Sequence, residues 1–308
     1  MASRELAEPV ESASRCRERA DESLFAFGFQ EVSRPTFSVG EQERKEIYKA
    51  AWKRGGGFRF MFETFGDISI DEAANKEASN FIKANIRETV KDENKARKLM
   101  PTQLYARRPL CDSGYYEQFN RDNVAVVSLA ETLIERMPPK GTLTTDGTEY
   151  ELDAIIFATG FDAVDGNYTR VAIQGREGNS QLALGRGGSD IVPGRPNGLF
   201  SNLPPAIETQ VEFISDTIEK ADKVSLDDTN GLSRTDSVTG KRSSSPMVEA
   251  LAESEERWTE ECDKLSAGSL FRRTDSWIFG SNVAGKKSSI LFYFAGLSAH
   301  RKVLARRS

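Results

Sequence analysis

Two adjacent arginines, Arg107 and Arg108, are the residues whose type and spacing best suit chemistry in this chain of 308 residues. They precede Pro109, and proline biases the residue before it toward an extended backbone, from which neighbouring side chains leave on opposite sides. Each guanidinium carries a permanent positive charge and a planar fork of donors that suits phosphates and oxyanions. Spacing alone leaves two interpretations open, an anion-binding pair and a solvated surface pair, since most charged side chains are simply exposed.

A second candidate site follows an apolar run, Ala154 to Ala158, which predicts a buried strand. The run ends at Thr159 and Gly160, where a small hydroxyl residue and a glycine let the backbone approach a bulky group. Nucleotide cofactors lie at the carboxyl ends of strands in α/β sheets, so this edge is a candidate cofactor site. An ordinary core strand that ends in a turn is the alternative.

The chain offers little for hydrolytic or metal chemistry. Its only histidine, His300, lies in a basic carboxyl-terminal segment, where we expect a solvated surface residue. Hydrolase triads and multi-histidine zinc sites are therefore poor predictions. The three cysteines, Cys16, Cys111 and Cys262, are far apart and match neither metal-ligand spacing nor a disulfide framework. We predict reduced thiols and no metal site.

The charge balance and the apolar runs exclude two further classes of partner. The formal net charge is −5, which argues against a general nucleic-acid binder. No apolar run approaches the roughly 20 residues that span a bilayer, and the amino terminus lacks the apolar core of a signal peptide. We therefore expect a cytoplasmic protein that binds neither membranes nor nucleic acid.

Apolar periodicity predicts two helices between residues 41 and 90. The first covers 41–54, and Gly55 to Gly57 end it. The second is expected to begin at Ser69, because Ser69 and Glu72 match a capping box. Apolar residues then form a stripe along one face of the second helix, namely Ala74, Ala78, Ile82, Ile86 and Val90, with Phe81 beside them.

The middle of the chain predicts short strands, and the last third predicts helices. We expect a strand at 124–127 and a hairpin at 143–150 on an Asp146–Gly147 turn. A helix is expected from Asn202, with Pro204 and Pro205 in its first turn. Its apolar stripe comprises Ile207, Val211, Ile214 and Ile218.

Three further elements are predicted toward the carboxyl terminus. A Ser-rich segment at 226–246 predicts a loop. Residues 247–267 predict a helix whose apolar face carries Val248, Leu251, Trp258, Cys262 and Leu265. An apolar run at 289–296 predicts a further strand.

Six strings are unusual enough to compare with known families: 55–62, 104–116, 119–124, 157–168, 200–208 and 275–280. In this order they resemble the flavin-dependent Baeyer–Villiger monooxygenases of the cyclohexanone monooxygenase type. The resemblance runs from about residue 20 to about residue 305 and covers only the carboxyl-terminal portion of the family's sequence.

The resemblance implies an α/β fold, an incomplete form of the flavoprotein monooxygenase fold with two dinucleotide-binding domains and a helical insertion. It implies a disordered or foreign leader at 1–20 and a helical insertion at 21–104. A remnant of the NADP-binding domain would follow at 105–150, and the carboxyl-terminal half of the FAD-binding domain at 151–308, with the loop at 226–246 inside it.

The resemblance also implies an activity: an FAD- and NADPH-dependent enzyme that uses oxygen to convert a ketone to an ester or lactone. In this family the second basic residue of the pair, here Arg108, is the catalytic residue that stabilises the flavin C4a-peroxide anion. Such stabilisation of developing negative charge is a large term in catalysis. Arg107 lies where the family contacts the reduced nicotinamide cofactor.

The remaining implied contacts are also with cofactors. Trp277 would lie against the nicotinamide ribose, the backbone of Thr159 and Gly160 near the flavin nucleotide, and the backbone near Leu203 against the flavin ring.

One departure from the family keeps a second reading open. Both cofactors normally lie on a Gly-x-Gly-x-x-Gly turn that holds the pyrophosphate, and this sequence contains no such turn. The alternative function is therefore a catalytically inactive fragment or an interaction protein.

Overall fold

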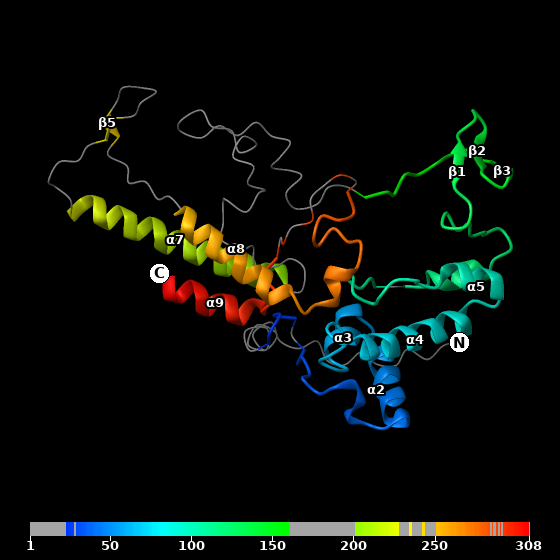
Figure 1. Cartoon of the computed structure of the whole chain (residues 1–308), viewed down its shortest axis with the longest axis horizontal. Coiled ribbons are helices and arrows are strands. Elements are labelled where there is room, and N and C mark those ends of the chain that lie inside the picture. The colour runs from blue at the N-terminus through cyan, green and yellow to red at the C-terminus, as the bar shows by residue number, and fades with distance from the viewer. Residues whose placement is uncertain are drawn as a thin grey trace, which may run out of the picture. The chain divides into compact units, whose positions relative to one another are not determined.

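Helices dominate the part of the chain that the computed structural model describes (Figure 1). The described residues are 23–27, 29–111, 113–160, 201–227, 234–235, 242–243, 251–283, 285, 288, 290 and 292–307. They divide into two compact units. Unit 2 comprises Ser33–Asp162 and Arg273–Asp275, and unit 1 comprises Met1–Val32, Ala163–Arg272 and Ser276–Ser308.

The elements follow one another along the chain in a mainly helical order. The helices are η1 (Thr36–Ser38), α2 (Glu41–Arg54), α3 (Gly57–Phe62), α4 (Glu72–Thr89), α5 (Glu93–Leu99), η2 (Tyr116–Asn120), α7 (Leu203–Asp227), α8 (Ala252–Ser266), η3 (Leu270–Arg273) and α9 (Gly296–Arg307). The strands are β1 (Ile134–Arg136), β2 (Gly141–Thr144), β3 (Glu149–Glu151), β4 (Arg234–Thr235) and β5 (Arg242–Ser243).

Helix α2 has the bounds that the sequence predicts. Acidic residues occupy its first turn and basic residues its last, as the helix dipole favours. Gly55 follows in the left-handed region at φ 78°, and its N–H donates to the carbonyls of Ala51 and Trp52. Glycine suits this position because it has no Cβ to clash.

Helix α4 begins later than the capping box predicted. Ser69 lies within a turn in which the N–H groups of Ile70 and Asp71 donate to the carbonyl of Asp67. Asp71 is the N-cap instead, and its carboxylate accepts from the N–H of Ala74 at 2.8 Å. The Ser69 prediction was wrong because that turn keeps the chain out of the helix until Asp71.

The predicted stripe of α4 is confirmed as the face that packs. Ala74, Ala78, Ile86 and Val90 are buried. Ala78 belongs to a core cluster with Tyr48 and Ala51 of α2, Phe60 of α3, and Phe65 and Ile68 of the following loop. Ile86 and Val90 form a second cluster with Ala96 of α5 and Phe119 of η2.

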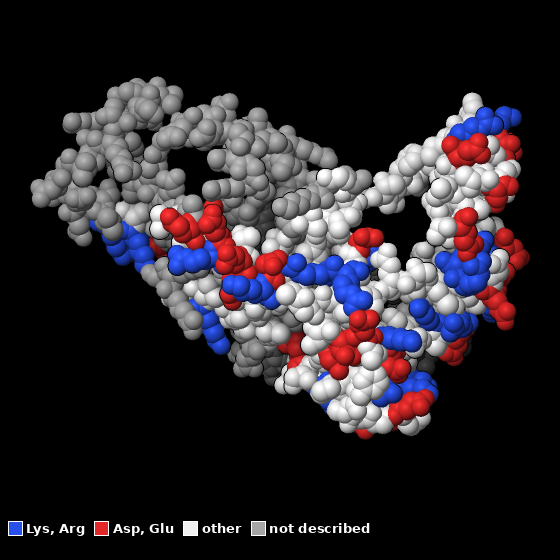
Figure 2. Space-filling model, viewed as in Figure 1, with Lys and Arg blue, Asp and Glu red and all other residues white. Residues whose placement is uncertain are grey.

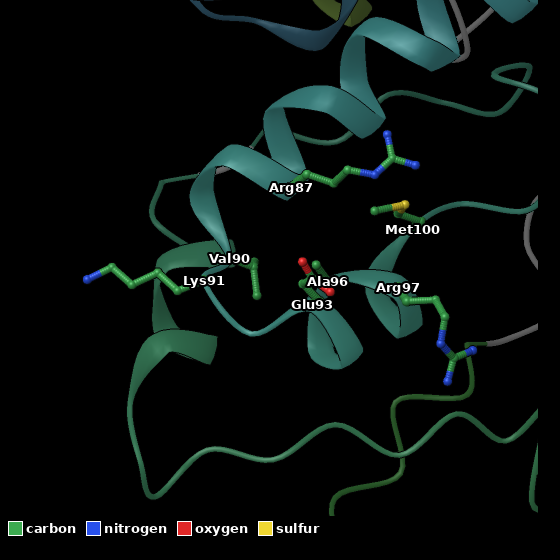
Figure 3. Close-up of a pocket in the computed structure, with 7 residues that line it drawn as sticks. All are labelled: Arg87, Val90, Lys91, Glu93, Ala96, Arg97 and Met100. Carbon is green, nitrogen blue, oxygen red and sulfur yellow. The ribbon is translucent and has the colours of Figure 1, made fainter.

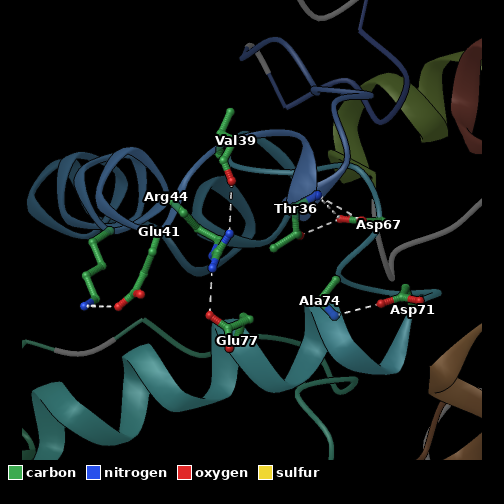
Figure 4. Close-up of polar contacts among 9 residues, drawn as sticks. Thr36, Val39, Glu41, Arg44, Asp67, Asp71, Ala74 and Glu77 are labelled. Carbon is green, nitrogen blue, oxygen red and sulfur yellow. Dashed lines mark hydrogen bonds and ion pairs between the residues drawn. The ribbon is translucent and has the colours of Figure 1, made fainter.

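Polar contacts fix the loops around α2 and α4 (Figure 4). The fully buried Thr36 donates to the carboxylate of Asp67 through its N–H, at 3.0 and 2.9 Å, and through its hydroxyl, at 2.6 Å. Arg44 of α2 lies 3.4 Å from the carboxylate of Glu77 of α4 and also donates to the carbonyl of Val39. These contacts tie η1 to the loop before α4 and α2 to α4 itself.

The hairpin at 143–150 is confirmed, and β1 extends it to an antiparallel sheet of order β1-β2-β3. Residues 124–127, in contrast, form no strand. The ammonium of Lys95 in α5 donates to the carbonyl of Val124 at 2.7 Å, and that of Lys98 to the carbonyl of Val126 at 3.5 Å. The strand prediction was wrong here because lysine side chains take the place of a neighbouring strand.

The strand predicted at 154–158 is also wrong, and so is the described part of the one predicted at 289–296, of which residues 289 and 291 lie outside the described residues. Residues 154–160 are extended and exposed, with Ile156 90% and Phe157 66% exposed, and no strand among the described residues pairs with them. Phe292 and Tyr293 are buried as expected, but they lead through a turn into α9. An apolar run indicates that its side chains are more stable when buried. A strand also needs hydrogen-bond partners for its backbone N–H and C=O groups.

Unit 1 contains α7, α8 and α9, and both helices that the sequence predicts there are present, α8 with a later start. Helix α7 begins after Asn202 with both prolines in its first turn, as predicted. It runs to Asp227, and the β4–β5 pair lies further into the 226–246 segment that was predicted as a loop. Helix α8 begins only after Leu251, which is exposed, while Trp258 and Cys262 are buried.

His300 is buried, which corrects the expectation of a surface residue. It lies on α9 at 1% exposure, together with the buried Leu297 and Leu304. Its ring centroid is 5.9 Å from that of Trp258 and 5.5 Å from that of Tyr293. The basic composition of the segment concealed an amphipathic helix, whose buried residues recur three and four positions apart.

The α/β prediction is only partly matched. The described residues form a mainly helical structure with two small antiparallel sheets. No parallel sheet occurs among them, because the runs that were expected to build it are extended or turned instead.

The start of α4 at Asp71 can be tested with two substitutions. Asp71→Ala should lower the free energy of unfolding by about 1 kcal/mol, because it removes the side-chain acceptor for the N–H of Ala74. Ser69→Ala should change it by less than about 0.5 kcal/mol. Urea unfolding followed by circular dichroism measures both, and a larger loss in Ser69→Ala would contradict this start of α4.

Candidate functional site

The arginine pair lies in unit 2, after α5, in the segment 104–109, which is neither helix nor strand and bends at Tyr105 and Arg107. Arg107 and Arg108 are exposed, whereas Ala106 before them is fully buried. The guanidinium carbon of Arg108 lies over the ring of Phe58 in α3, 5.5 Å from the ring centroid. Such a contact stabilises an exposed cation by about 0.5–1 kcal/mol. Arg108 therefore has a defined neighbour and remains accessible to an anion.

Helix α3 approaches the arginine segment closely at Gly57. A Cβ at this position would lie 2.5 Å from the Cβ of Pro109 and 3.1 Å from the carbonyl oxygen of Leu110. Only glycine fits without a shift of one backbone or the other. This close approach brings Phe58, the next residue, to Arg108.

Two side chains bond to the backbone just before the arginine pair. The side-chain amide of Asn75 in α4 accepts from the N–H of Tyr105 at 2.9 Å and donates to its carbonyl at 2.8 Å. The hydroxyl of Thr274 donates to the carbonyl of Ala106 at 2.9 Å. The segment is thus held by hydrogen bonds from two parts of the chain that are distant in sequence.

Tyr105 itself packs into the core of unit 2. Its ring meets that of Phe60 edge-on, with centroids 6.0 Å apart, and its hydroxyl donates to the carbonyl of Gly57 at 3.3 Å. Burial raises the pKa of the Tyr105 phenol well above its usual value, so the hydroxyl remains a neutral donor.

Asn75 is not among the residues predicted for the site, although the sequence carries a signal for it. Asn75 lies three residues before Ala78, on the apolar face of α4, and is fully buried. A buried amide needs partners for its donors and acceptors. A single asparagine within an apolar stripe therefore indicates that some backbone segment lies against it.

Thr159 and Gly160 lie in an exposed, extended segment at the end of the described part of unit 2. Gly160 has φ 82°, and no atom lies within 4 Å of the position that a Cβ would take. Among the described residues, none fills this position, and the cofactor contact stays a prediction.

Leu203 and Trp277 belong to unit 1. Leu203 is the exposed first residue of α7. Pro204 and Pro205 carry no N–H, and the N–H of Ala206 bonds to the carbonyl of Asn202 at 3.4 Å. This helix start therefore offers fewer free donors than an ordinary one, which has four.

Trp277 is half-buried, and its ring meets that of Phe292 edge-on with centroids 5.6 Å apart. Four of the six predicted site residues thus lie in unit 2, and Leu203 and Trp277 lie in unit 1. The four residues in unit 2 form two pairs of sequence neighbours, Arg107 with Arg108 and Thr159 with Gly160.

A pocket of about 420 Å³ lies elsewhere, between the end of α4 and α5 (Figure 3). Three cationic residues line it, Arg87, Lys91 and Arg97. In Figure 3, however, Lys91 points away from the others, and Arg97 pairs with Glu131. Glu93 adds a negative charge to the lining. The cations do not converge on one point, so this pocket offers no clear anion site.

Three further features of the described residues are the charge on one face, the possible metal ligands and the apolar character of the helices. On the face in Figure 2, cationic and anionic side chains are interspersed. Among the described residues, no group of three or more His, Cys, Asp or Glu side chains could hold a metal ion. None of the described helices is both long enough and apolar enough to cross a membrane.

Comparison with known proteins identifies relatives. The chain is 44% identical over 292 residues to cyclohexanone 1,2-monooxygenase of Acinetobacter sp, an alignment that covers 91% of this chain and 50% of that protein. It is 43% identical over 296 residues to phenazine N-monooxygenase of Lysobacter antibioticus, covering 92% and 51%. No protein-family model matches the chain.

The comparison with solved structures finds the same kind of protein. A closed crystal structure of cyclohexanone monooxygenase matches with a TM-score of 0.82 and 47% identity, covering 95% of this chain and 54% of that one. Cyclohexanone monooxygenase from Rhodococcus sp. Phi1, bound to NADP+, matches with a TM-score of 0.80 and 46% identity, covering 94% and 53%. The structure thus corresponds to roughly half of that fold.

These matches show that the chain is homologous to flavin-dependent monooxygenases. Within this class, the chain is a homologue of the Baeyer–Villiger monooxygenases of the cyclohexanone monooxygenase type. It spans about half the length of the curated relatives that it matches.

The contact between α3 and the arginine segment can be tested at Gly57. Gly57→Ala should lower the free energy of unfolding by about 1–3 kcal/mol, because the new methyl group must push Pro109 or α3 aside. Gly268→Ala is the matched control, since a Cβ there meets no atom within 4 Å. Denaturant unfolding measures both, and equal stabilities would contradict the close approach.

Proposed function

We propose that this chain contributes to an FAD- and NADPH-dependent monooxygenase of Baeyer–Villiger type, which inserts oxygen next to a ketone carbonyl to give an ester or lactone. The observation that carries the proposal is the homology over more than nine-tenths of the chain, combined with an exposed arginine in a rigidly bonded segment. The flavin, when bound, supplies the oxygen-activating chemistry, and the protein supplies charge and position.

The two exposed arginines suit the negative charge that such cofactors carry. Arg108 is fixed near Phe58 yet exposed, so its guanidinium can stabilise negative charge that develops beside it. Arg107 is exposed next to it and would contact the nicotinamide cofactor. For the remaining assignments, Thr159, Gly160 and Leu203 to flavin and Trp277 to nicotinamide, the support is the family resemblance together with exposure or partial exposure.

The domain assignment belongs to the same proposal. Residues 21–104 would be the helical insertion, 105–150 the remnant of the NADP-binding domain, and 151–308 the carboxyl-terminal half of the FAD-binding domain. The helices α2 to α5 support the first assignment.

A second function is favoured by one specific observation, the absence of a Gly-x-Gly-x-x-Gly turn from the sequence. Without such a turn, the pyrophosphate of FAD or NADPH lacks the backbone N–H donors that usually bind it. On this reading the chain is a non-catalytic protein that retains the family's arginine segment.

The substrate class is a further part of the proposal. Identity to the cyclohexanone enzyme and to the phenazine N-oxygenating enzyme differs by one percentage point, 44% against 43%. Overall identity therefore does not separate a ketone from an aromatic nitrogen as the oxygen acceptor. Parallel assays with cyclohexanone and phenazine, read by mass spectrometry of the products, separate them directly.

The two functions predict different results for the purified chain incubated with FAD and desalted. An enzyme should retain the visible absorption of flavin and oxidise NADPH in the presence of cyclohexanone, with ester formation. A colourless protein that forms no ester would instead establish the non-catalytic reading.

Arg108→Ala tests the proposed catalytic residue. It should reduce ester formation by at least about 10²-fold, because the positive charge beside the developing anion is lost. Arg136→Ala, an exposed arginine of β1 in the same unit, should leave the rate unchanged. Normal ester formation by Arg108→Ala would show that another residue stabilises the anion.

A further inference from the structure

We propose that Asn75 and Thr274 are positioning residues, which together fix the backbone before Arg107 and thereby set the location of the Arg108 guanidinium. The proposal rests on the proposed role of Arg108, and it concerns residues that do not themselves meet a cofactor or substrate.

Asn75 holds the segment as a strand partner would. Both hydrogens of its side-chain amide are used, one for the carbonyl of Tyr105 and one for that of Ile68, each at 2.8 Å. Its oxygen accepts from the N–H of Tyr105 at 2.9 Å. Both backbone groups of Tyr105 are therefore bonded to one buried side chain. An apolar residue at 75 would leave all three backbone groups without this partner, which is costly in a buried place.

Thr274 holds the next carbonyl. Its buried hydroxyl donates to the carbonyl of Ala106 from a residue 168 positions away in sequence. Arg273, its neighbour, forms an ion pair with Glu72 at the start of α4, the helix that also carries Asn75. Residues 273–275 belong to the same compact unit as the arginine segment. The two tethers thus share α4 as their support.

Little freedom remains between these tethers and Pro109. Proline has a fixed φ, and the Cβ and carbonyl carbon of Pro109 lie 2.5 and 3.3 Å from the place of a Cβ at Gly57. Only Arg107 and Arg108 lie between the bonded residue Ala106 and this contact. Their backbone is therefore held at both ends, and the side chain of Arg108 starts from a fixed point toward the ring of Phe58.

Position matters for a charge that stabilises a reacting group. A misplacement of about 1 Å can cost about 10²-fold in rate, even when every catalytic group is still present. Loss of either tether should therefore lower turnover more than it lowers the binding of the substrate.

The direct test reads the position of Arg108 without any need for activity. The full chain, labelled with 13C at arginine, should show Arg108 Cδ–H signals that are shifted by the ring of Phe58. Arg108→Lys assigns these signals, and Phe58→Leu identifies the ring's contribution. In Asn75→Ala and Thr274→Val the signals should move toward those of a solvated arginine.

Two variants serve as controls. Asn85→Ala removes an amide that donates within α4 to the carbonyl of Phe81, so it should leave the Arg108 signals in place. Thr274→Ser keeps the hydroxyl and should restore the signals that Thr274→Val loses. If Asn75→Ala does not fold, the Thr274 pair carries the test alone. Unchanged Arg108 signals in the folded tether variants would overturn the proposal.

Kinetics connect the position to the reaction. With cyclohexanone as substrate, Thr274→Val and Asn75→Ala should lower kcat by about 10²-fold and change KM little, while Asn85→Ala keeps the unmodified kcat. Tether variants with unchanged kcat would overturn the positioning role. If the unmodified chain forms no ester at all, the proposed function fails, and the Arg108 signals still decide whether Asn75 and Thr274 set its position.

Discussion

The aromatic core around Tyr48 is the packing on which the arginine segment depends. Its ring centroid lies 5.2 Å from that of Phe60 and 5.3 Å from those of Phe65 and Phe81, so α2, α3, α4 and the loop between α3 and α4 meet at one residue. Burial raises the pKa of Tyr48 to about 12, in keeping with a phenol that stays neutral inside the core. Because Phe60 also meets Tyr105, this core determines where the chain before Arg107 lies.

Hydrogen bonds from buried polar side chains then fix where the arginine segment lies against that core. Hydrophobic contact is not directional, so it holds helices together without fixing the position of an irregular segment beside them. The amide of Asn75 and the hydroxyl of Thr274 fix that position, since each hydrogen bond needs one particular backbone atom at one particular distance. The arginine pair is exposed, yet the two side chains that place it, those of Asn75 and Thr274, are buried.

Unit 1 shows a looser relation between pattern and packing. The apolar stripe of α7 is present, but Ile207, Val211, Ile214 and Ile218 are each about half exposed, whereas Trp258, Tyr293 and His300 pack closely. A stripe of this kind normally faces a core. The relatives that the chain matches are about twice its length, so they have more chain from which such a core can be built.

The sequence by itself determined the family, the helices α2 and α7, the buried face of α4, and the hairpin of β2 and β3, because these depend on residues close together along the chain. Helical periodicity, a glycine after α2 and an Asp-Gly turn act within a few positions. Tertiary structure alone decided that residues 124–127 and 154–158 form no strand, since pairing needs a distant partner. It also decided that His300 is buried and that Asn75 bonds to Tyr105, 30 positions later. Hydrogen bonds between distant segments exist only once the helices have packed, so no local pattern could reveal them.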